Sequence, residues 1–582
     1  MRSVMSALLT VCGLLGVLCF GAIALKLRVA PEGWANWAVA HGFRSDWILY
    51  PPFKVVVGCA ACSVFAMLAG SSLSSQLGKP LEESTSHGSA RFASTEELRR
   101  YGYSEALGSK WSLFLIWLRL RAFPHINGVV LGQENTAQLE MYLGDRGGPA
   151  FRVKRSAPLI IVREHHVGVE GPPGSGKDVS IALPALWYDY NRSVVVLDPK
   201  GDQFATTSGA RSALSVVKKF CPTEPDSARF NPLCVVPVGT PSEVTEVEQI
   251  SNALLGVMKD EKDPSTFYSK SAQPLLSAAI LYALHNAPKG EKSLATAFDL
   301  LGGGGDPKEK VERISSGLPK SAKYLRDMLK TMKDDKKTIQ SMFTTCLNAL
   351  DFCKDPMVRH ATSGSDFVPS DLFARDVPLS LYLVIPFKHA DALRPLMRLI
   401  LNVLIGSHTE KRKRDTCYYL NEFPSIGKVP AIVRAAAEIR AYGVQFALFW
   451  QSEGQLIDAY KESSQTILDI CRARVLLGVS GRMASENASA LAGKTTIVRA
   501  RETEAVSQKS FLDSTRTRTY GQGEQARELL SPDEVRTLSP DKALVILPYL
   551  HPYLATRCVS YAQPRFKRAR SVPSPARFEV PA

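Results

Sequence analysis

The chain is short of acidic residues and has no cysteine cluster. Its 582 residues include 71 Lys and Arg against 56 Asp and Glu, which gives a formal net charge of +15. The 11 cysteines are scattered without the spacing of metal ligands. Cys59 and Cys62 lie in an apolar run, which favours membrane packing over redox or zinc chemistry. These features argue against a zinc or disulfide protein. The positive charge suits an anionic partner or a membrane surface, or else forms an ordinary basic surface.

Two long runs near the N-terminus lack any charged residue. The first covers residues 4–25, and at about 1.5 Å per residue such a helix crosses a hydrocarbon core of about 30 Å. The second lies between Lys54 and Lys79. We therefore predict two transmembrane helices within residues 1–80. A cleaved signal peptide ending near Ala24 is the alternative for the first run.

A glycine-rich loop follows the apolar run of residues 167–169. Gly171, Gly176 and Lys177 fit the phosphate-loop pattern G-x-x-x-x-G-K, and a helix-like run follows. In such a loop, backbone N–H groups, the positive end of the helix dipole and the lysine all attract phosphate. We predict a nucleotide site; a surface loop rich in Gly and Pro is the alternative. The predicted nucleotide-binding residues are Gly171, Pro172, Pro173, Gly174, Ser175, Gly176, Lys177, Asp178 and Val179.

Apolar strands alternate with helical segments on both sides of a helical region. Such strands are typical of a mostly parallel sheet covered by helices, so we predict an α/β fold with a doubly wound sheet. Residues 242–363 instead have helical periodicity and predict an inserted all-α domain. Strands are predicted at 193–197, 379–385, 417–420, 446–450, 474–479, 543–548 and 555–561, and helices at 243–259, 269–285, 321–332, 337–353, 431–442 and 466–471.

Four parts of the chain follow from these patterns. Residues 1–80 are the predicted membrane anchor, and residues 242–363 are the inserted domain. Residues 81–241 and 364–562 together form the nucleotide-binding domain. Residues 563–582 are basic and contain proline, which predicts a disordered tail.

Two residue types that usually contact magnesium in such a site are missing. Asp178 stands where Ser or Thr is usual, and Asn421 stands where Asp is usual. A carboxylate about 5 Å from a phosphate charge costs about 3 kcal/mol at an effective dielectric of about 20, so Asp178 repels nucleotide unless a cation lies between them. We hypothesise that Asp178 and Asn421 hold magnesium and that nucleotide binding depends strongly on the metal. Poor nucleotide binding with lost hydrolysis is the alternative.

The predicted catalytic residues are Lys177, Glu422 and Gln451. Glu422 follows residues 417–420, a strand expected to neighbour that of the phosphate loop, and fits the carboxylate that orients the attacking water. Gln451 ends the next strand, where a side chain can sense the γ-phosphate. A polar strand end satisfied by backbone groups explains Gln451 nearly as well.

Five stretches together resemble the type IV secretion coupling proteins, the TraG-like family of membrane-anchored ATPases. They are HGSARFA (87–93), GPPGSGK (171–177), VVVLDPKGD (194–202), NEFPSIGKVP (421–430) with YGVQFALFWQS (442–452), and LLSPDEVRTLSPDKALVI (529–546). The sequence departs from the family at Asn421, where Asp is usual, and at Asp178, where Gly, Thr or Ser is more common.

The resemblance implies a RecA-like P-loop NTPase domain with an inserted all-α domain and a two-helix transmembrane anchor. It also implies ATP and Mg²⁺ as cofactors and homo-hexamers around a central channel. The implied partners are type IV secretion channel components and a DNA–relaxase complex or protein effectors. Because ATP is cytosolic, we expect a two-pass protein of the bacterial inner membrane with most of the chain cytoplasmic.

Two other functions are open. A nucleotide-dependent docking scaffold that does not hydrolyse ATP would explain Asp178 and Asn421. A DNA translocase of the chromosome-segregation type shares the motor, but it is expected to carry more membrane spans and a C-terminal DNA-reading domain. The basic run at residues 411–414 is consistent with DNA or anionic lipid, although a charged turn between sheet elements is the simpler explanation.

Overall fold

The structure, a computed structural model, divides into two compact units, Met1–Thr85 and Ser86–Ala582. It describes residues 89–101, 103, 129–133, 138–143, 149–154, 159–189, 191–256, 267–331, 336–409, 411–435, 438–510, 513–563 and 566–575, all in the second unit. The two predicted membrane spans lie outside the described residues. Within the described ranges, no helix has both the length and the apolar character needed to cross a bilayer.

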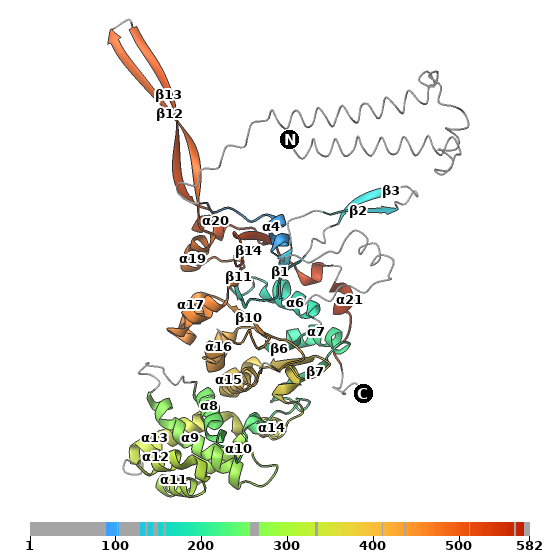
Figure 1. Cartoon of the computed structure of the whole chain (residues 1–582), viewed down its shortest axis with the longest axis vertical. Coiled ribbons are helices and arrows are strands. Elements are labelled where there is room, and N and C mark those ends of the chain that lie inside the picture. The colour runs from blue at the N-terminus through green and yellow to red at the C-terminus, as the bar shows by residue number, and fades with distance from the viewer. Residues whose placement is uncertain are drawn as a thin grey trace, which may run out of the picture. The chain divides into compact units, whose positions relative to one another are not determined.

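A sheet of eleven strands forms the centre of the second unit (Figure 1). Its strands are β1 Val129–Gln133, β4 Leu159–Val162, β5 Val167–Glu170, β6 Ser193–Asp198, β7 Val216–Phe220, β8 Leu379–Val384, β9 Thr416–Leu420, β10 Val444–Trp450, β11 Ala473–Leu476, β14 Lys542–Ile546 and β15 Tyr553–Thr556. Their order is β4-β1-β15-β14-β11-β5-β10-β9-β6-β8-β7. Two separate antiparallel hairpins are formed by β2 Gln138–Leu143 with β3 Pro149–Lys154, and by β12 Lys494–Ser510 with β13 Asp513–Glu528.

The strands from β11 to β7 run parallel, and β14, β15, β1 and β4 extend the sheet in antiparallel fashion. Every residue of β6 and β8 is buried, as expected for parallel strands with helices on both faces. The predicted α/β class with a mostly parallel sheet is confirmed. One detail of the prediction is wrong, because β10 lies between the phosphate-loop strand β5 and the Glu422 strand β9.

Helices pack against both faces of the sheet. Val194 and Val196 of β6 face one core together with α6 (Leu183–Tyr188), whereas Val195 and Leu197 face a second core with α15 (Ala390–Gly406). Figure 1 shows α6 and α7 (Asp202–Ser212) on the first face and α15, α16 (Pro430–Ala435) and α17 (Glu453–Tyr460) on the opposite face. The remaining described α-helices outside the β7–β8 segment are α4 Thr95–Arg100, α18 Ser463–Ile470, α19 Arg482–Ala492, α20 Pro532–Arg536 and α21 Lys567–Arg570.

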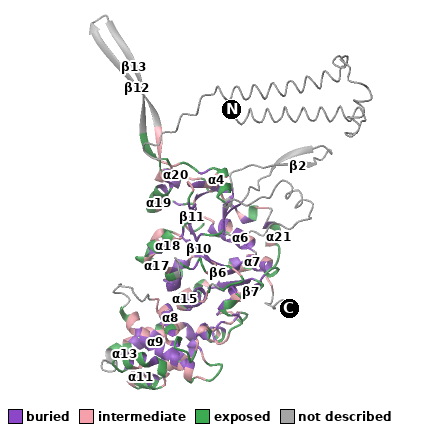
Figure 2. Cartoon of the chain, in the orientation of Figure 1, coloured by how far each residue is buried: buried purple, intermediate pink, exposed green. Residues whose placement is uncertain are grey.

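No β-strand lies among the described residues between β7 and β8, where α-helices are joined by loops, turns and short 3-10 segments. The α-helices are α8 Glu243–Leu255, α9 Phe267–Asn286, α10 Leu294–Gly302, α11 Pro307–Ser316, α12 Lys323–Thr331, α13 Lys336–Ala349 and α14 Pro356–Ala361. Leu276 and Ile280 of α9 are fully buried and belong to the same core as Leu396 of α15. Figure 2 shows buried residues along the sheet and through α9. The helical segment and the sheet therefore share one hydrophobic core, and the boundaries of an inserted domain at 242 and 363 remain a prediction.

Most of the predicted helices are present with shifted ends. The helices expected at 243–259, 269–285, 321–332 and 337–353 correspond to α8, α9, α12 and α13. The helix expected at 431–442 instead ends at Ala435. Residues 438–442 form turns instead, with Tyr442 N–H donating to the Ile439 carbonyl and Gly443 N–H donating to the Arg440 carbonyl. Gly443 has a φ of 71°, a conformation that glycine adopts readily and that leads the chain into β10.

Part of the predicted disordered tail is packed against the α/β fold. Phe566 is 3% exposed, and its ring centre lies 5.2 Å from that of Trp187. Further along, Ser574 Oγ lies 2.8 Å from Ser208 Oγ of α7. One buried aromatic ring thus anchors a segment whose charge favours disorder. Residues 576–582 lie outside the described residues.

Candidate functional site

The phosphate loop depends on glycine at three positions. Gly174 and Gly176 have φ angles of 77° and 80°, which side chains rarely tolerate. A Cβ added at Gly171 would lie 2.7 Å from the carbonyl oxygen of Leu477, so only glycine fits this close approach. The helix that follows begins with a π-helical turn, Asp178–Ala182, before α6. Glycine therefore shapes a loop at the carboxyl end of β5.

Lys177 is nearly buried at this loop, with 8% of its side chain exposed. Its ammonium Nζ donates to the carbonyl of Gly171. It also lies 3.4 Å from Glu422 Oε1. A buried cation needs such partners, because it has lost most of its hydration.

Glu422 and Gln451 reach the same point from two other strands. Glu422 follows β9 in the left-handed conformation, with a φ of 49°. Strained backbone of this kind concentrates at functional sites. The Gln451 amide Nε2, just after β10, donates to Glu422 Oε2 at 2.9 Å. The structure thus brings together the three predicted catalytic residues, because the carboxyl ends of parallel strands meet at one edge of the sheet.

Asp178 and Asn421, the two predicted magnesium ligands, are in direct contact. Asn421 Nδ2 donates to Asp178 Oδ1 at 3.2 Å, and Gln203 Nε2 donates to the same oxygen at 3.1 Å. Asp178 is exposed to solvent, but protein atoms also surround its carboxylate. The resulting desolvation raises the pKa of Asp178, and the charge of Lys177 opposes this rise. Gln203 was not among the predicted site residues, although it directly follows the strand-end segment 198–202.

The oxygens at this point suit magnesium. Within the described part of the chain, neither Asn421 Oδ1 nor Gln203 Oε1 has a hydrogen-bond partner. Carboxylate and amide oxygens are hard donors, and Mg²⁺ typically takes one or two protein ligands together with water and phosphate oxygens. No group of three His, Cys, Asp or Glu that could hold a metal is found among the described residues. Asp178 and Asn421 therefore fit this ion, with Gln203 beside them.

Asp198 positions Gln203. Its carboxylate, at the end of β6, accepts hydrogen bonds from the backbone N–H groups of Gly201 at 2.9 Å and Phe204 at 2.8 Å. These contacts fix the start of α7, which carries Gln203. Burial raises the pKa of Asp198 to about 6.

Glu170 is a buried carboxylate directly before the loop. It is 5% exposed, and Trp450 Nε1 lies 3.3 Å from its Oε2. Burial, followed by the nearby charge of Glu453, raises the pKa of Glu170 to about 7. The strand end that carries the loop therefore contains a group that titrates near neutral pH.

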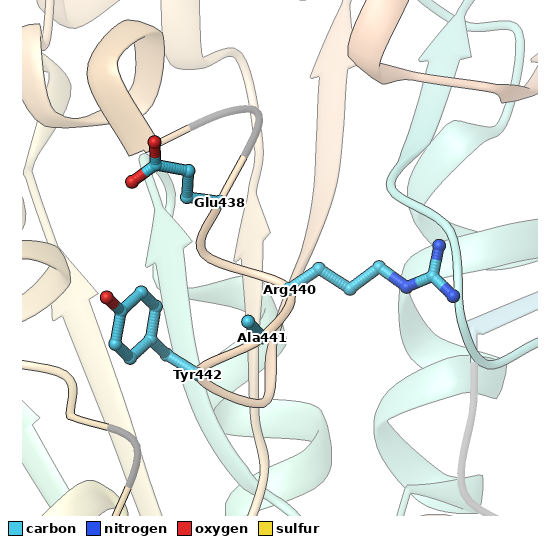
Figure 3. A pocket seen from close by; sticks show the side chains of 4 residues that line it. All are labelled: Glu438, Arg440, Ala441 and Tyr442. Atoms are coloured by element: carbon cyan, nitrogen blue, oxygen red, sulfur yellow. The ribbon is translucent and has the colours of Figure 1, made fainter.

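An open cavity of about 550 Å³ lies elsewhere on the surface. Glu438, Arg440, Ala441 and Tyr442 line it (Figure 3). These residues precede β10, so the cavity lies near the amino ends of the parallel strands, whereas the phosphate loop lies at their carboxyl ends. It is not part of the candidate site.

The raised pKa of Glu170 predicts a pH-dependent stability. The folded chain holds a proton that the unfolded chain releases between pH 4.5 and about 7. Protonation of Glu170 therefore stabilises the folded chain below pH 4.5. As the pH rises through about 7, this stabilisation is lost, and the free energy of unfolding falls by about 3 kcal/mol. Relative to the wild type, Glu170→Gln should therefore gain stability between pH 5 and pH 8, measured as urea midpoints.

The exposed Glu164, with 76% of its side chain accessible, provides the matched control. Glu164→Gln should keep the wild-type pH dependence. Identical pH dependence of Glu170→Gln and the wild type would contradict the assignment.

Comparisons with known proteins agree with the motifs and the fold. Residues 126–579 match the family model described as Type IV secretory system Conjugative DNA transfer. The chain is 28% identical over 488 residues to the conjugal transfer protein TraG of Escherichia coli, covering 78% of this chain and 72% of TraG. It is 27% identical over 586 residues to protein VirD4 of Rhizobium radiobacter, and the match covers 97% of this chain and 78% of VirD4.

Two solved structures of the conjugative coupling protein TrwB share the fold. The unbound form has a TM-score of 0.53 and 18% identity, and the match covers 68% of this chain and 84% of TrwB. The complex with ADP and Mg²⁺ has a TM-score of 0.51 and 16% identity, and the match covers 70% of this chain and 89% of TrwB. The family model matches most of the chain. The chain therefore belongs to the type IV secretion coupling proteins of conjugative DNA transfer, which pass substrates to the secretion channel.

Proposed function

We propose that this coupling protein binds ATP with magnesium at the loop of residues 171–179 and hydrolyses the ATP during substrate transfer. The observation that carries the proposal is the contact of Lys177 with Glu422 at 3.4 Å, with Gln451 bonded to Glu422 at 2.9 Å. Lysine, carboxylate and amide from three strand ends form the arrangement that phosphoryl transfer needs. TrwB, which shares the fold, has been solved with ADP and Mg²⁺.

Nucleotide binding requires Lys177 to change partners. Its ammonium now contacts the Gly171 carbonyl and Glu422. Phosphate oxygens are stronger partners for an ammonium than a neutral carbonyl, because both groups are charged. Lys177 thus turns from the loop backbone toward the phosphate, which frees Glu422 for a second task.

That task is to orient the attacking water. The Glu422 side chain is 30% exposed, which leaves it open to solvent. Gln451 fixes one carboxylate oxygen and leaves the other for water once Lys177 has moved. A base must lie within hydrogen-bond reach of the proton it takes, so the fixed carboxylate contributes orientation as well as basicity.

Asp178 and Asn421 would hold magnesium at the same edge. Asn421 Nδ2 lies 3.2 Å from Asp178 Oδ1, and rotation of the amide would bring Asn421 Oδ1, which has no hydrogen-bond partner in the described part of the chain, beside this carboxylate. When bound, the ion would neutralise charge on the phosphate oxygens. The site would then keep one carboxylate for the ion. Asp178 would supply it from the loop, in place of the Asp that is usual at position 421.

The second candidate is a docking scaffold in which nucleotide only stabilises assembly. Asp178 and Asn421 favour it, because both depart from the residues usual at these positions. ATP turnover by the full-length chain, with and without DNA, separates the two functions. Absence of turnover under both conditions would favour the scaffold and contradict the proposed hydrolysis.

We further propose a two-pass inner-membrane protein with its bulk in the cytoplasm. The charge-free runs 4–25 and 55–78 and the family membership support this location. Homo-hexamers, channel components, and a DNA–relaxase complex or protein effectors are the partners that the resemblance implies. The full-length chain should stay in the membrane pellet after alkaline carbonate extraction. Its recovery in the soluble fraction would contradict the anchor.

Glu422→Gln tests the catalytic carboxylate. The variant keeps the size of the side chain, so we expect ATP affinity within about twofold of the wild type. Loss of an orienting carboxylate should lower turnover by about 100-fold or more. The exposed Glu462 gives a control, and Glu462→Gln should hydrolyse ATP at the wild-type rate. Wild-type turnover by Glu422→Gln would exclude the assigned role.

The exchange of Asp178→Thr with Asn421→Asp tests the shared ion. Asp178→Thr alone leaves no carboxylate between the two positions, and Asn421→Asp alone places two carboxylates in contact. Both single variants should therefore lose Mg²⁺-dependent ATP affinity, whereas the double variant should recover it. Calorimetric titration with and without Mg²⁺ measures this coupling. Additive losses in the double variant would show that the two positions act independently.

A further inference from the structure

Arg557 packs against the phosphate loop, although it lies in none of the sequence motifs described above. It directly follows β15, and a Cβ added at Gly176 would collide with its Nη2. Its Nε and Nη2 donate to Ser180 Oγ at 3.2 and 3.0 Å, and its Nη1 donates to the Pro540 carbonyl at 2.6 Å. The guanidinium is thereby fixed against the last loop glycine and the first turn of the following helix.

The sheet order indicates which end of a bound nucleotide would lie near Arg557. Lys177, Glu422 and Gln451 gather on the side of β10 and β9, so the terminal phosphate belongs there. The strands β11, β14 and β15 lie on the opposite side of β5. A polyphosphate bound along the loop therefore runs from the β10 side toward β15. Its α-phosphate and nucleoside approach Arg557.

Arg557 has no anionic partner in the described part of the chain, where its hydrogen bonds go to a hydroxyl and a carbonyl. Burial lowers its pKa, an effect that Tyr561 and Asp541 oppose from a distance. The buried Arg192, by contrast, donates to both carboxylate oxygens of Asp189. A partly buried cation beside a phosphate loop, without a carboxylate in contact, is free to pair with an anionic ligand.

We infer that Arg557 is the second cation of the nucleotide site and binds the α-phosphate. This inference rests on the proposed binding of nucleotide at the loop. The guanidinium is a planar fork that matches two phosphate oxygens, and it can exchange its bonds to Ser180 Oγ for this stronger pair. Arg557 would act in binding and positioning the nucleotide, on the side away from Glu422.

A purely structural role is the alternative, in which Arg557 only braces the loop through Ser180. Ser180→Ala separates the two roles, because it removes the hydroxyl and keeps the cation. Arg557→Gln removes the cation, and Arg557→Lys keeps the charge but loses the fork. Arg536, which pairs with Asp533 on the surface, gives the control Arg536→Gln.

The experiment measures the affinity of the full-length chain in detergent for ADP with Mg²⁺, by calorimetry. We expect Arg557→Gln to weaken ADP binding by about tenfold or more, as for the loss of charge-assisted hydrogen bonds. Arg557→Lys should lose less, and Ser180→Ala and Arg536→Gln should stay within about twofold of the wild type. Melting temperatures without nucleotide report folding, and Arg557→Gln should melt near the wild type.

Two outcomes would overturn the inference while nucleotide binding stands. The first is wild-type ADP affinity in Arg557→Gln. The second is a loss in Ser180→Ala as large as that in Arg557→Gln, which would assign Arg557 to bracing alone. If Arg557→Gln does not fold, Arg557→Lys provides the test. Equal ADP affinity of Arg557→Lys and the wild type would contradict the contact of the guanidinium with two phosphate oxygens. If the wild type itself binds no ADP, the proposed function fails and the inference fails with it.

Discussion

The nearly buried ammonium of Lys177 is the interaction on which the rest of the site depends. With 8% of its side chain exposed, it has lost most of its hydration and needs partners from the protein. It finds the Gly171 carbonyl and the Glu422 carboxylate. Phosphate oxygens compete for the same contacts. In the proposed mechanism, a nucleotide replaces this interaction, and Glu422 then becomes available to water.

The sheet makes this contact possible by bringing distant segments to one edge. Lys177 follows β5, Glu422 follows β9, and Gln451 follows β10, which lies between the other two strands. The supporting residues come from the next strand in the same way. Asp198 ends β6 and holds the start of α7, from which Gln203 reaches Asp178 at 3.1 Å. On the far side of β5, Arg557 follows β15 and contacts the loop. In the proposed arrangement, the site extends across the sheet, with Glu422 and Gln451 toward β9 and Arg557 toward β15.

The sequence was sufficient to predict the phosphate loop and the polar residues at strand ends, because neighbouring residues determine both. Glycines followed by Lys177 predicted the loop, and apolar runs ending in polar residues predicted Glu422 and Gln451 at strand ends. Strand order is different, because hydrophobic periodicity says which segments are strands and nothing about their neighbours. The position of β10 between β5 and β9, and hence the contact of Gln451 with Glu422, could not be read from the chain. Gln203 and Arg557 were missed for the same reason.

Composition also misled the prediction where a single residue decided the structure. The tail after Gln563 is basic, but one buried ring, Phe566, packs on Trp187 and orders the segment around it. The helix expected through Tyr442 ends at Ala435, and Gly443, with a φ of 71°, leads the chain into β10. In both places a tertiary contact or a backbone angle outweighed the average character of the segment.

The most direct test is a structure of the full-length chain with a non-hydrolysable ATP analogue and Mg²⁺. The proposed mechanism predicts that Lys177 Nζ leaves the Gly171 carbonyl for the phosphate. It also predicts that oxygens of Asp178 and Asn421 lie about 2.1 Å from the ion. A bound nucleotide with Lys177 still on Gly171 and Glu422, or an ion out of reach of both Asp178 and Asn421, would contradict it.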